Sequence, residues 1–356
     1  MQNTSNQNYC SRPWNEVYFE GDYIGPCCNN THLFKGSIDE YYKSNELIEL
    51  KTFFENNKKH ESCTSCWIAE KSGAPSARIK TKIDSNVLNI SLNITNTCNF
   101  KCRMCSPRFS SSWSSDAEAL KIKQSEPVYL TTSVSILDWV IEQCKTNQVN
   151  LLIQGGEPLF SNEFIYLLSS FEKLNIFKNI KLQLTSNLSK TKYKKINYYN
   201  IFKKFKSVEI SASIDGIGEV GEYIRTGFKQ DTFDKNLAIF KPFIKHFSFT
   251  YQIYNVFHVP EFFEYANFHK IPVKVCWLRG PKYLSVNALS KIDRKNILLS
   301  YKEKKFFNPY FLNNLVSNFY YQNQSNKFWE YTESLDKLWS KSWNDSIPEI
   351  GILLND

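Results

Sequence analysis

Three cysteines in one short stretch decide how this sequence is interpreted: Cys98-Asn99-Phe100-Lys101-Cys102-Arg103-Met104-Cys105. The stretch follows an apolar run over residues 87–94 that predicts a buried strand. Thiolates are preferred ligands of iron–sulfur clusters, and three from one loop can bind one face of a cubane and leave the fourth iron without a protein ligand. A disulfide would leave one cysteine unpaired, and a closed structural zinc site would need a fourth ligand from another segment. The location therefore favours an open, reactive site.

Beyond this loop, short apolar runs alternate with amphipathic stretches, a pattern typical of parallel strands joined by crossover helices. Six strands are predicted, at residues 87–94, 149–153, 180–184, 208–214, 247–254 and 273–278. Helices are predicted between them at residues 136–144, 164–174, 233–243 and 261–268. We expect an α/β fold whose βα units form an open or closed barrel, with its chemistry at the carboxyl ends of the strands.

The segments before and after the predicted barrel have their own sequence features. The first part contains five cysteines, at Cys10, Cys27, Cys28, Cys63 and Cys66. A hairpin is predicted through residues 17–19 and 23–24, and helical spacing at 38–42 and 46–54 could fold the cysteine groups together. A structural zinc site is one hypothesis for these thiols. From residue 302 onward we expect helices, with one packing face formed by Trp329, Leu335, Leu338 and Trp339.

Composition narrows the class of protein. The formal charge of +9 is scattered over 356 residues, and no basic stripe interleaved with aromatic residues indicates a nucleic-acid partner. An anionic substrate would explain the positive net charge equally well.

The polar start and the lack of any run of about 20 apolar residues predict a soluble, cytoplasmic protein with no membrane partner. In a reducing compartment, clustered cysteines indicate metal or redox chemistry rather than disulfides, and buried Cys144 and Cys276 are expected to act as small apolar side chains.

The three-cysteine loop after the first strand resembles that of the radical S-adenosylmethionine (radical SAM) superfamily. Members carry this spacing at the end of the first strand of a partial (βα)6 barrel. The resemblance implies that Cys98, Cys102 and Cys105 hold a catalytic [4Fe–4S] cluster whose open iron binds the amino and carboxylate groups of S-adenosylmethionine. Met104 stands where the family usually has an aromatic residue near the adenine, and a thioether can fill that space.

Later strand ends carry motifs similar to the family's cofactor-binding positions. Gly155-Gly156-Glu157-Pro158 is similar to the motif that binds the amino group of S-adenosylmethionine, and glycine would let the backbone approach the ligand. Thr185-Ser186-Asn187 is similar to the family's Thr-Asn-Gly, with Leu188 in place of glycine. Taken singly, a polar strand end, a helix cap or a surface charge would explain such residues. The resemblance implies cofactor contacts for Gly155, Gly156, Glu157, Ser186, Ser213, Arg225 and Asn255.

The amino-terminal cysteines are similar to the SPASM and twitch modules of radical SAM enzymes, although such modules usually follow the barrel. The resemblance implies an auxiliary [4Fe–4S] cluster on Cys10, Cys27, Cys63 and Cys66, with Cys28 as an alternative to Cys27. The expected domains are a cysteine-rich, twitch-like module at residues 1–82, the partial barrel at 83–300 and a helical extension at 301–356.

The implied activity is reductive cleavage of S-adenosylmethionine to a 5′-deoxyadenosyl radical that abstracts hydrogen from a substrate. An outside flavodoxin or ferredoxin would supply the electron. The module favours a peptide or protein substrate, and oxidation or rearrangement of a small molecule such as a sugar, alcohol or nucleotide is the alternative. A non-catalytic metal-binding scaffold would explain the cysteines but not Gly155-Gly156-Glu157, and a redox sensor on nucleic acid would lack a recognition helix.

Overall fold

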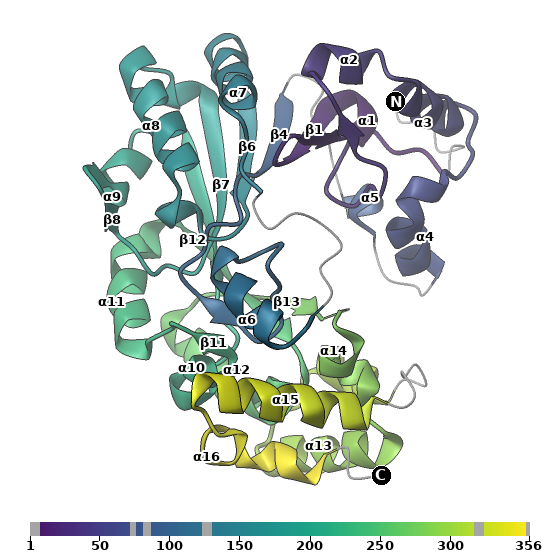
Figure 1. The fold of residues 1–356 in the computed structure, drawn as a ribbon, viewed down its shortest axis with the longest axis vertical. Helices are drawn as coiled ribbons and strands as arrows, with labels where there is room; N and C mark the ends of the chain where they lie inside the picture. The colour runs from purple at the N-terminus through teal and green to yellow at the C-terminus, as the bar shows by residue number, and fades with distance from the viewer. Residues whose placement is uncertain are drawn as a thin grey trace. The chain divides into compact units, whose positions relative to one another are not determined.

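The computed structural model describes residues 8–71, 76–80, 87–122, 130–278, 280–316 and 324–353. The chain groups into two compact units (Figure 1). The first unit contains residues 1–97, 127–185 and 192–209, and the second contains residues 98–126, 186–191 and 210–356. The expected domain boundary between residues 82 and 83 lies outside the described residues, and the three-domain division stays a prediction.

The first unit is built on parallel strands. β4 (Leu88–Asn93) pairs with β6 (Val149–Gln154), and β6 pairs with β7 (Ile180–Ser186). Every second residue of β6 is fully buried, which is how a strand with one face on the core is expected to alternate. Helices α7 (Val134–Thr146) and α8 (Asn162–Leu174) pack on each other and lie beside β6 and β7 (Figure 1).

Helix α8 shows why the sequence folds this way locally. Its N-cap Ser161 accepts a hydrogen bond of 3.1 Å from the Phe164 amide, which satisfies one of the free donors of the first turn. Its end is marked by Asn175 in the left-handed conformation. The buried face has the spacing of an amphipathic helix and consists of Phe164, Leu167, Leu168 and Phe171.

The amino-terminal hairpin extends this sheet. β1 (Glu16–Glu20) pairs antiparallel with β2 (Tyr23–Gly25), as predicted, and β2 pairs with β3 (Phe34–Lys35). The sequence does not predict the other partner of β1, which runs parallel to β4 with Val17 opposite Ile90. The remaining elements of this unit are α1 (Arg12–Asn15), α2 (Ile38–Tyr42), α3 (Asn45–Glu55), α4 (Thr64–Lys71), α5 (Ala77–Lys80), β8 (Lys192–Tyr193), β9 (Ile196–Asn197) and α9 (Tyr198–Phe202).

The second unit continues the parallel pattern. β10 (Ser207–Ser213), whose first three residues group with the first unit, pairs with β12 (Ile244–Tyr251), and β12 pairs with β13 (Val273–Trp277). Short strands β5 (Lys101–Cys102) and β11 (Arg225–Thr226) form a separate antiparallel pair. The helices between these strands are α6 (Ser114–Ala119), α10 (Gly218–Ile224), α11 (Gln230–Phe240) and α12 (Val259–His269).

All six predicted strands and the four helices between them are present, and the mixed α/β class with mostly parallel strands is confirmed. The fifth strand is three residues shorter than predicted at its end. It stops at Tyr251 because the side chains of Gln252 and Asn255 form a capping box that starts the 3-10 helix η6 (Ile253–His258).

The carboxyl-terminal part is helical, as predicted, with α13 (Lys291–Glu303), α14 (Pro309–Leu315), α15 (Ser325–Trp339) and α16 (Trp343–Ser346). Figure 1 shows α15 alongside α16, and the rings of Trp329 and Trp343 are 5.0 Å apart. The predicted packing face of α15 is wrong in part, because Leu338 is 40% exposed. The buried face instead consists of Phe328, Thr332, Leu335 and Asp336.

Candidate metal centres and cofactor site

The cysteines of the predicted cluster loop lie in one turn of the second unit. Cys102 is the last residue of β5 and stands opposite Arg225 in β11. A backbone hydrogen bond of 2.9 Å from the Cys105 amide to the Cys102 carbonyl then closes the turn. The side chains of these two cysteines are hydrogen-bonded to each other. The turn therefore brings two of the three thiols into contact.

Electrostatic interactions link the third thiol to the other two. The hydrogen bond from Cys105 lowers the pKa of Cys102, against the effect of burial and with the help of the Arg225 guanidinium. The pKa of Cys105 is raised by that hydrogen bond, by burial, and by the charges of Cys102 and Cys98. Three interacting thiols on one loop are the donor set that a [4Fe–4S] cluster needs from this segment.

A cubane binds each thiol through a different iron, so its ligands need not converge on one point. Within the described ranges, no three His, Cys, Asp or Glu side chains are close enough to hold a single metal ion.

Side chains that follow the loop hold its backbone. Ser112 donates a hydrogen bond of 2.6 Å to the Cys98 carbonyl, and the Trp113 indole donates one of 2.9 Å to the Cys102 carbonyl. Ser110 donates to the carbonyl of Phe100 at 2.7 Å. Trp113 is fully buried. The loop is thus fixed by specific donors rather than left as an open turn.

A buried ion pair lies beside Cys102. The Nε atom of Arg225 is 2.8 Å from Oδ2 of Asp215, which is fully buried at the end of β10. The other oxygen of Asp215 accepts a hydrogen bond of 2.7 Å from the Thr250 amide. Burial acts to lower the pKa of Arg225, but the charges of Asp215 and Cys102 raise it above its usual value. The loop thiols therefore have a permanent positive charge as a neighbour.

Asn255 supports this pair. It lies in η6 rather than on the fifth strand, and it is fully buried. Its side-chain nitrogen donates hydrogen bonds of 2.9 Å to the carbonyls of Asp215 and Thr250, and its oxygen accepts one of 3.0 Å from the Gln252 amide. Because these bonds tie together the segments that hold Asp215, the geometry favours a bracing role for Asn255.

Ser186 and Ser213 end two of the strands. Ser186 is buried, and its hydroxyl accepts a hydrogen bond of 3.0 Å from the Leu188 amide. Leu188 has a φ of 55°, the left-handed conformation that a glycine adopts without strain. The leucine at this position thus adopts a backbone conformation that favours glycine. Ser213 is half-buried and stands opposite Ser248 in β12.

The predicted Gly155-Gly156-Glu157 turn lies in the first unit, directly after β6. A Cβ atom on Gly155 would be 2.4 Å from the Thr95 carbonyl oxygen, and one on Gly156 would be 2.3 Å from that of Thr97. The amides of Gly156 and Glu157 donate to these same carbonyls at 2.7 and 2.8 Å. In this structure the glycines are required by close contact with the segment that leads into Cys98. Glu157 is fully buried, and its carboxylate accepts a hydrogen bond of 3.0 Å from the Leu159 amide.

The five amino-terminal cysteines come together in the first unit from three separate segments. Burial is the largest cause of the raised pKa at Cys10, Cys28 and Cys63, and the charge of Cys66 raises each of them further. The pKa of Cys63 rises to about 11. Cys27 is next to Cys28 and buried. The charge of Cys66 thus acts on thiols of all three segments, and Cys63 packs against a buried cluster that contains Cys10.

Arg12 supplies the positive charge of this group. Its guanidinium lowers the pKa of Cys27, Cys28 and Cys10, although burial has the larger and opposite effect at each thiol. Arg12 also forms an ion pair of 2.9 Å with Glu16. A cation beside several thiols favours their deprotonated form, which is the form that binds metal.

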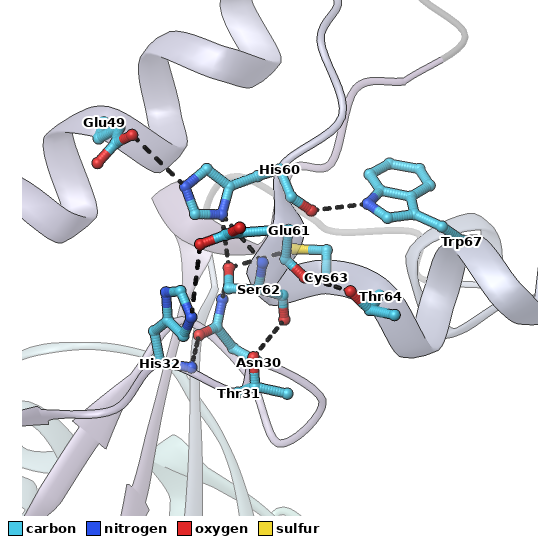
Figure 2. Close-up of polar contacts among 10 residues, drawn as sticks. All are labelled: Asn30, Thr31, His32, Glu49, His60, Glu61, Ser62, Cys63, Thr64 and Trp67. Atoms are coloured by element: carbon cyan, nitrogen blue, oxygen red, sulfur yellow. Dashed lines mark hydrogen bonds and ion pairs between the residues drawn. The ribbon is translucent and has the colours of Figure 1, made fainter.

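A hydrogen-bond network fixes Cys63 against the segment after Cys27 and Cys28 (Figure 2). Ser62 accepts a hydrogen bond of 2.8 Å from the Asn30 side chain and shares one of 2.8 Å with Nδ1 of His60. The Thr31 amide donates to the Ser62 carbonyl at 3.1 Å. All of these side chains except Thr31 are buried. The network explains how cysteines more than thirty positions apart share one site.

Sequence reasoning does not identify three of the residues that shape these sites: Asp215, Arg103 and His60. Asp215 lies inside the Ser213-Ile214-Asp215-Gly216 segment, where a carboxylate directly after a strand was the available signal. Arg103 is fully buried between two cysteines, and a charged residue in such a loop was a weaker signal. Cys144 is fully buried, as predicted, whereas Cys276 is only half-buried.

Comparison with known proteins gives one family. Residues 92–261 match the family model of the Radical SAM superfamily. Similar solved structures include native anSMEcpe with bound AdoMet, at 18% identity over 64% of this chain and 62% of that chain, with a TM-score of 0.42. Another is Streptococcus suis SuiB bound to precursor peptide SuiA, at 15% identity over 83% of this chain and 61% of that chain, with a TM-score of 0.41.

The chain spans about three fifths of the length of these two proteins. No curated protein matches it. Of the helices in the described ranges, none is both long and apolar enough to cross a membrane.

Proposed function

We propose that this protein is a radical SAM enzyme that cleaves S-adenosylmethionine reductively to start radical chemistry, and the match of residues 92–261 to the Radical SAM family model supports the proposal. One observation carries the proposal. Cys98, Cys102 and Cys105 lie on one loop with interacting thiols, and the carbonyls of Cys98 and Cys102 accept hydrogen bonds from the half-buried Ser112 and the buried Trp113. Three thiols from one segment suit a [4Fe–4S] cluster with one iron left for another ligand.

Bound together, the cluster and S-adenosylmethionine would supply an electron transfer that breaks a carbon–sulfur bond and gives a 5′-deoxyadenosyl radical. The chain's own residues would bind and orient the cofactor. We assign contacts with S-adenosylmethionine to Gly155, Gly156, Glu157, Ser186, Ser213 and Arg225. Because Nε of Arg225 is bound to Asp215, a carboxylate would be held by the terminal nitrogens of that guanidinium.

Asn255 has a different role in this proposal from the direct contact that the resemblance implies. Both polar atoms of its amide bind protein groups around Asp215. We therefore assign it to positioning the Asp215–Arg225 pair rather than to binding the cofactor itself.

The amino-terminal thiols would hold an auxiliary [4Fe–4S] cluster through Cys10, Cys63, Cys66 and either Cys27 or Cys28. The convergence of these thiols beside Arg12 supports a metal site, and zinc is the competing occupant. With four protein ligands the cluster would serve electron transfer. An outside one-electron donor such as flavodoxin or ferredoxin would reduce the enzyme.

We favour a peptide or protein as the substrate. The support is the resemblance of the amino-terminal cysteines to SPASM and twitch modules, which are most typical of peptide-modifying enzymes. Radical oxidation or rearrangement of a small molecule is the alternative.

The proposal is tested by isolating the protein without oxygen, reconstituting it, and counting iron and sulfide per chain. About eight irons are expected for two cubanes, and about four for a single one. Dithionite and S-adenosylmethionine should then release 5′-deoxyadenosine from the native protein. Release should be lost in Cys102→Ala and kept in Cys276→Ala, a matched control that lies on β13.

Two outcomes would contradict the proposal. If the native protein binds zinc but no iron, the proposed iron–sulfur cluster is not present. Release of 5′-deoxyadenosine by Cys102→Ala at the native rate would show that this loop does not hold the catalytic cluster.

A further inference from the structure

Arg103 lies between two of the loop cysteines and is fully buried. Its guanidinium forms an ion pair with the carboxylate of Asp336, which belongs to α15 near the other end of the chain. Its Nε atom donates a hydrogen bond of 3.1 Å to the Tyr223 carbonyl. The loop that carries the candidate cluster ligands is therefore tied to a carboxyl-terminal helix through a buried charge pair.

Aromatic rings surround the same guanidinium. Its central carbon is 3.6 Å from the ring centroid of Tyr223 and 5.4 Å from those of Tyr254 and Trp339. Such rings attract a cation and keep water away from it. In these surroundings salt screens the charge of Arg103 less than it screens an exposed charge.

The carboxylate of Asp336 has hydrogen-bond donors besides the Arg103 guanidinium. The Tyr223 hydroxyl donates to both of its oxygens, at 3.0 and 3.2 Å, and the Trp343 amide donates to Oδ2 at 2.7 Å. These two donors and the guanidinium together bind both carboxylate oxygens. The pair is thus an ion pair whose acidic member is also held by α10 and by the start of α16.

Two further contacts join α15 to the loop and to α6. The Tyr331 hydroxyl donates a hydrogen bond of 2.6 Å to the carbonyl of Arg103. The Trp339 indole donates one of 2.8 Å to Asp116, which also forms an ion pair of 2.7 Å with Lys101. Helix α15 therefore contacts the loop through its backbone and through the residues on both sides of Cys102.

One donor of Arg103 has no partner in the described part of the chain. Its Nη1 atom is buried and makes no hydrogen bond there. A buried ion pair with an unused donor adds little to stability, because apolar side chains of similar volume usually serve as well. The arrangement is more easily explained by a requirement to hold the loop and to balance charge beside it.

We propose that Asp336 is a positioning residue that acts through Arg103, and that the pair sets both the geometry of the cluster loop and the charge beside the cluster. This inference rests on the proposed function. Reduction adds negative charge to a cluster, so a net positive neighbour makes reduction easier and a net negative one makes it harder. The pair, when complete, contributes almost no net charge.

The two charges can be removed separately, which gives predictions of opposite sign. Asp336→Asn leaves the Arg103 charge uncompensated, and the midpoint potential of the loop cluster should become more positive. Arg103→Gln leaves the Asp336 charge, and the potential should become more negative. The double variant should lie between the two. Glu333→Gln, an exposed substitution on the same helix, should leave the potential unchanged.

The measurement is an anaerobic redox titration followed by electron paramagnetic resonance, together with the rate of iron loss to a chelator. Shifts of opposite sign in the two single variants support the proposal. Shifts of the same sign, or none, overturn it. Tyr331→Phe keeps all charges and removes one hydrogen bond to the loop, so it should speed iron loss and leave the potential near the native value.

Variants that fail to bind a cluster also test the positioning role of Asp336. If Asp336→Asn loses its cluster while its apo-protein unfolds at the native temperature, and Asp336→Glu restores loading, positioning is supported. If loading is lost only together with the fold, the pair is merely structural and the proposal fails. A native protein that never binds a cluster contradicts the proposed function itself and is thereby distinguished from a failure of this inference.

Discussion

The two cysteine groups of this protein are built in different ways. Cys98, Cys102 and Cys105 come from one loop, and buried ion pairs of Arg103 and Arg225 lie around them. The amino-terminal group takes its thiols from three segments, of which neutral hydrogen bonds centred on Ser62 join two, and the Arg12 guanidinium acts on Cys10, Cys27 and Cys28. The comparison indicates that buried ion pairs brace the first group, whereas hydrogen bonds between distant segments brace the second.

The largest expected effect separates the roles of the two groups. Cys105→Ala should abolish 5′-deoxyadenosine release, because the loop cluster would lose one of its three protein ligands. The double variant Cys63→Ala/Cys66→Ala should lose about four irons and still cleave S-adenosylmethionine, because the loop is intact. Iron analysis and single-turnover product assays measure both. Loss of cleavage in the amino-terminal variant would show that the two sites are not independent.

A smaller effect is expected when the Asp215–Arg225 ion pair of the first site is broken. Asp215→Asn leaves the Arg225 guanidinium buried without its anion, which typically costs about 3–5 kcal/mol in the free energy of unfolding. Urea unfolding of the apo-protein measures this cost. Asp138→Asn is the matched control, because Asp138 is exposed and accepts a hydrogen bond from the Tyr166 hydroxyl. Equal stabilities of the two variants would show that the pair is not needed by the fold.

The smallest effect concerns the neutral network of the second site. Ser62→Ala removes a hydroxyl that bonds to His60 and Asn30, so two buried polar groups lose a partner. We expect a loss of about 1–3 kcal/mol in the free energy of unfolding, measured by the same urea titration. Thr52→Ala, which removes an exposed hydroxyl on α3, should change stability far less. An unchanged Ser62→Ala protein would mean that the network in Figure 2 does not hold the cysteines together.

Features that are local in sequence could be predicted from it. The three-cysteine spacing, the alternation of β6 and the helical spacing of α8 each lie within a single element, so residue order alone reveals them. The same holds for the hairpin of β1 and β2. The parallel pairing of β1 with β4 was missed, because periodicity shows that a strand exists but not which strand it joins.

Sequence patterns do not predict contacts between residues that are distant in the sequence. Arg103 and Asp336 are 233 positions apart, and no periodicity connects a loop arginine to a helix aspartate. The packing face of α15 was misjudged at Leu338, because residue type suggested burial where the helix phase places the side chain outward. The left-handed backbone at Leu188 could not be predicted from a leucine. The only indication of it was that the similar family motif has a glycine at this position.

Electron paramagnetic resonance of the reduced protein, with and without S-adenosylmethionine, tests the central claim most directly. The signal that depends on Cys102 should change when S-adenosylmethionine is added, and the signal that depends on Cys63 should stay the same. If the cofactor alters neither signal, or alters only the one that requires Cys63, the assignment of the open cluster to the loop of Cys98, Cys102 and Cys105 is contradicted.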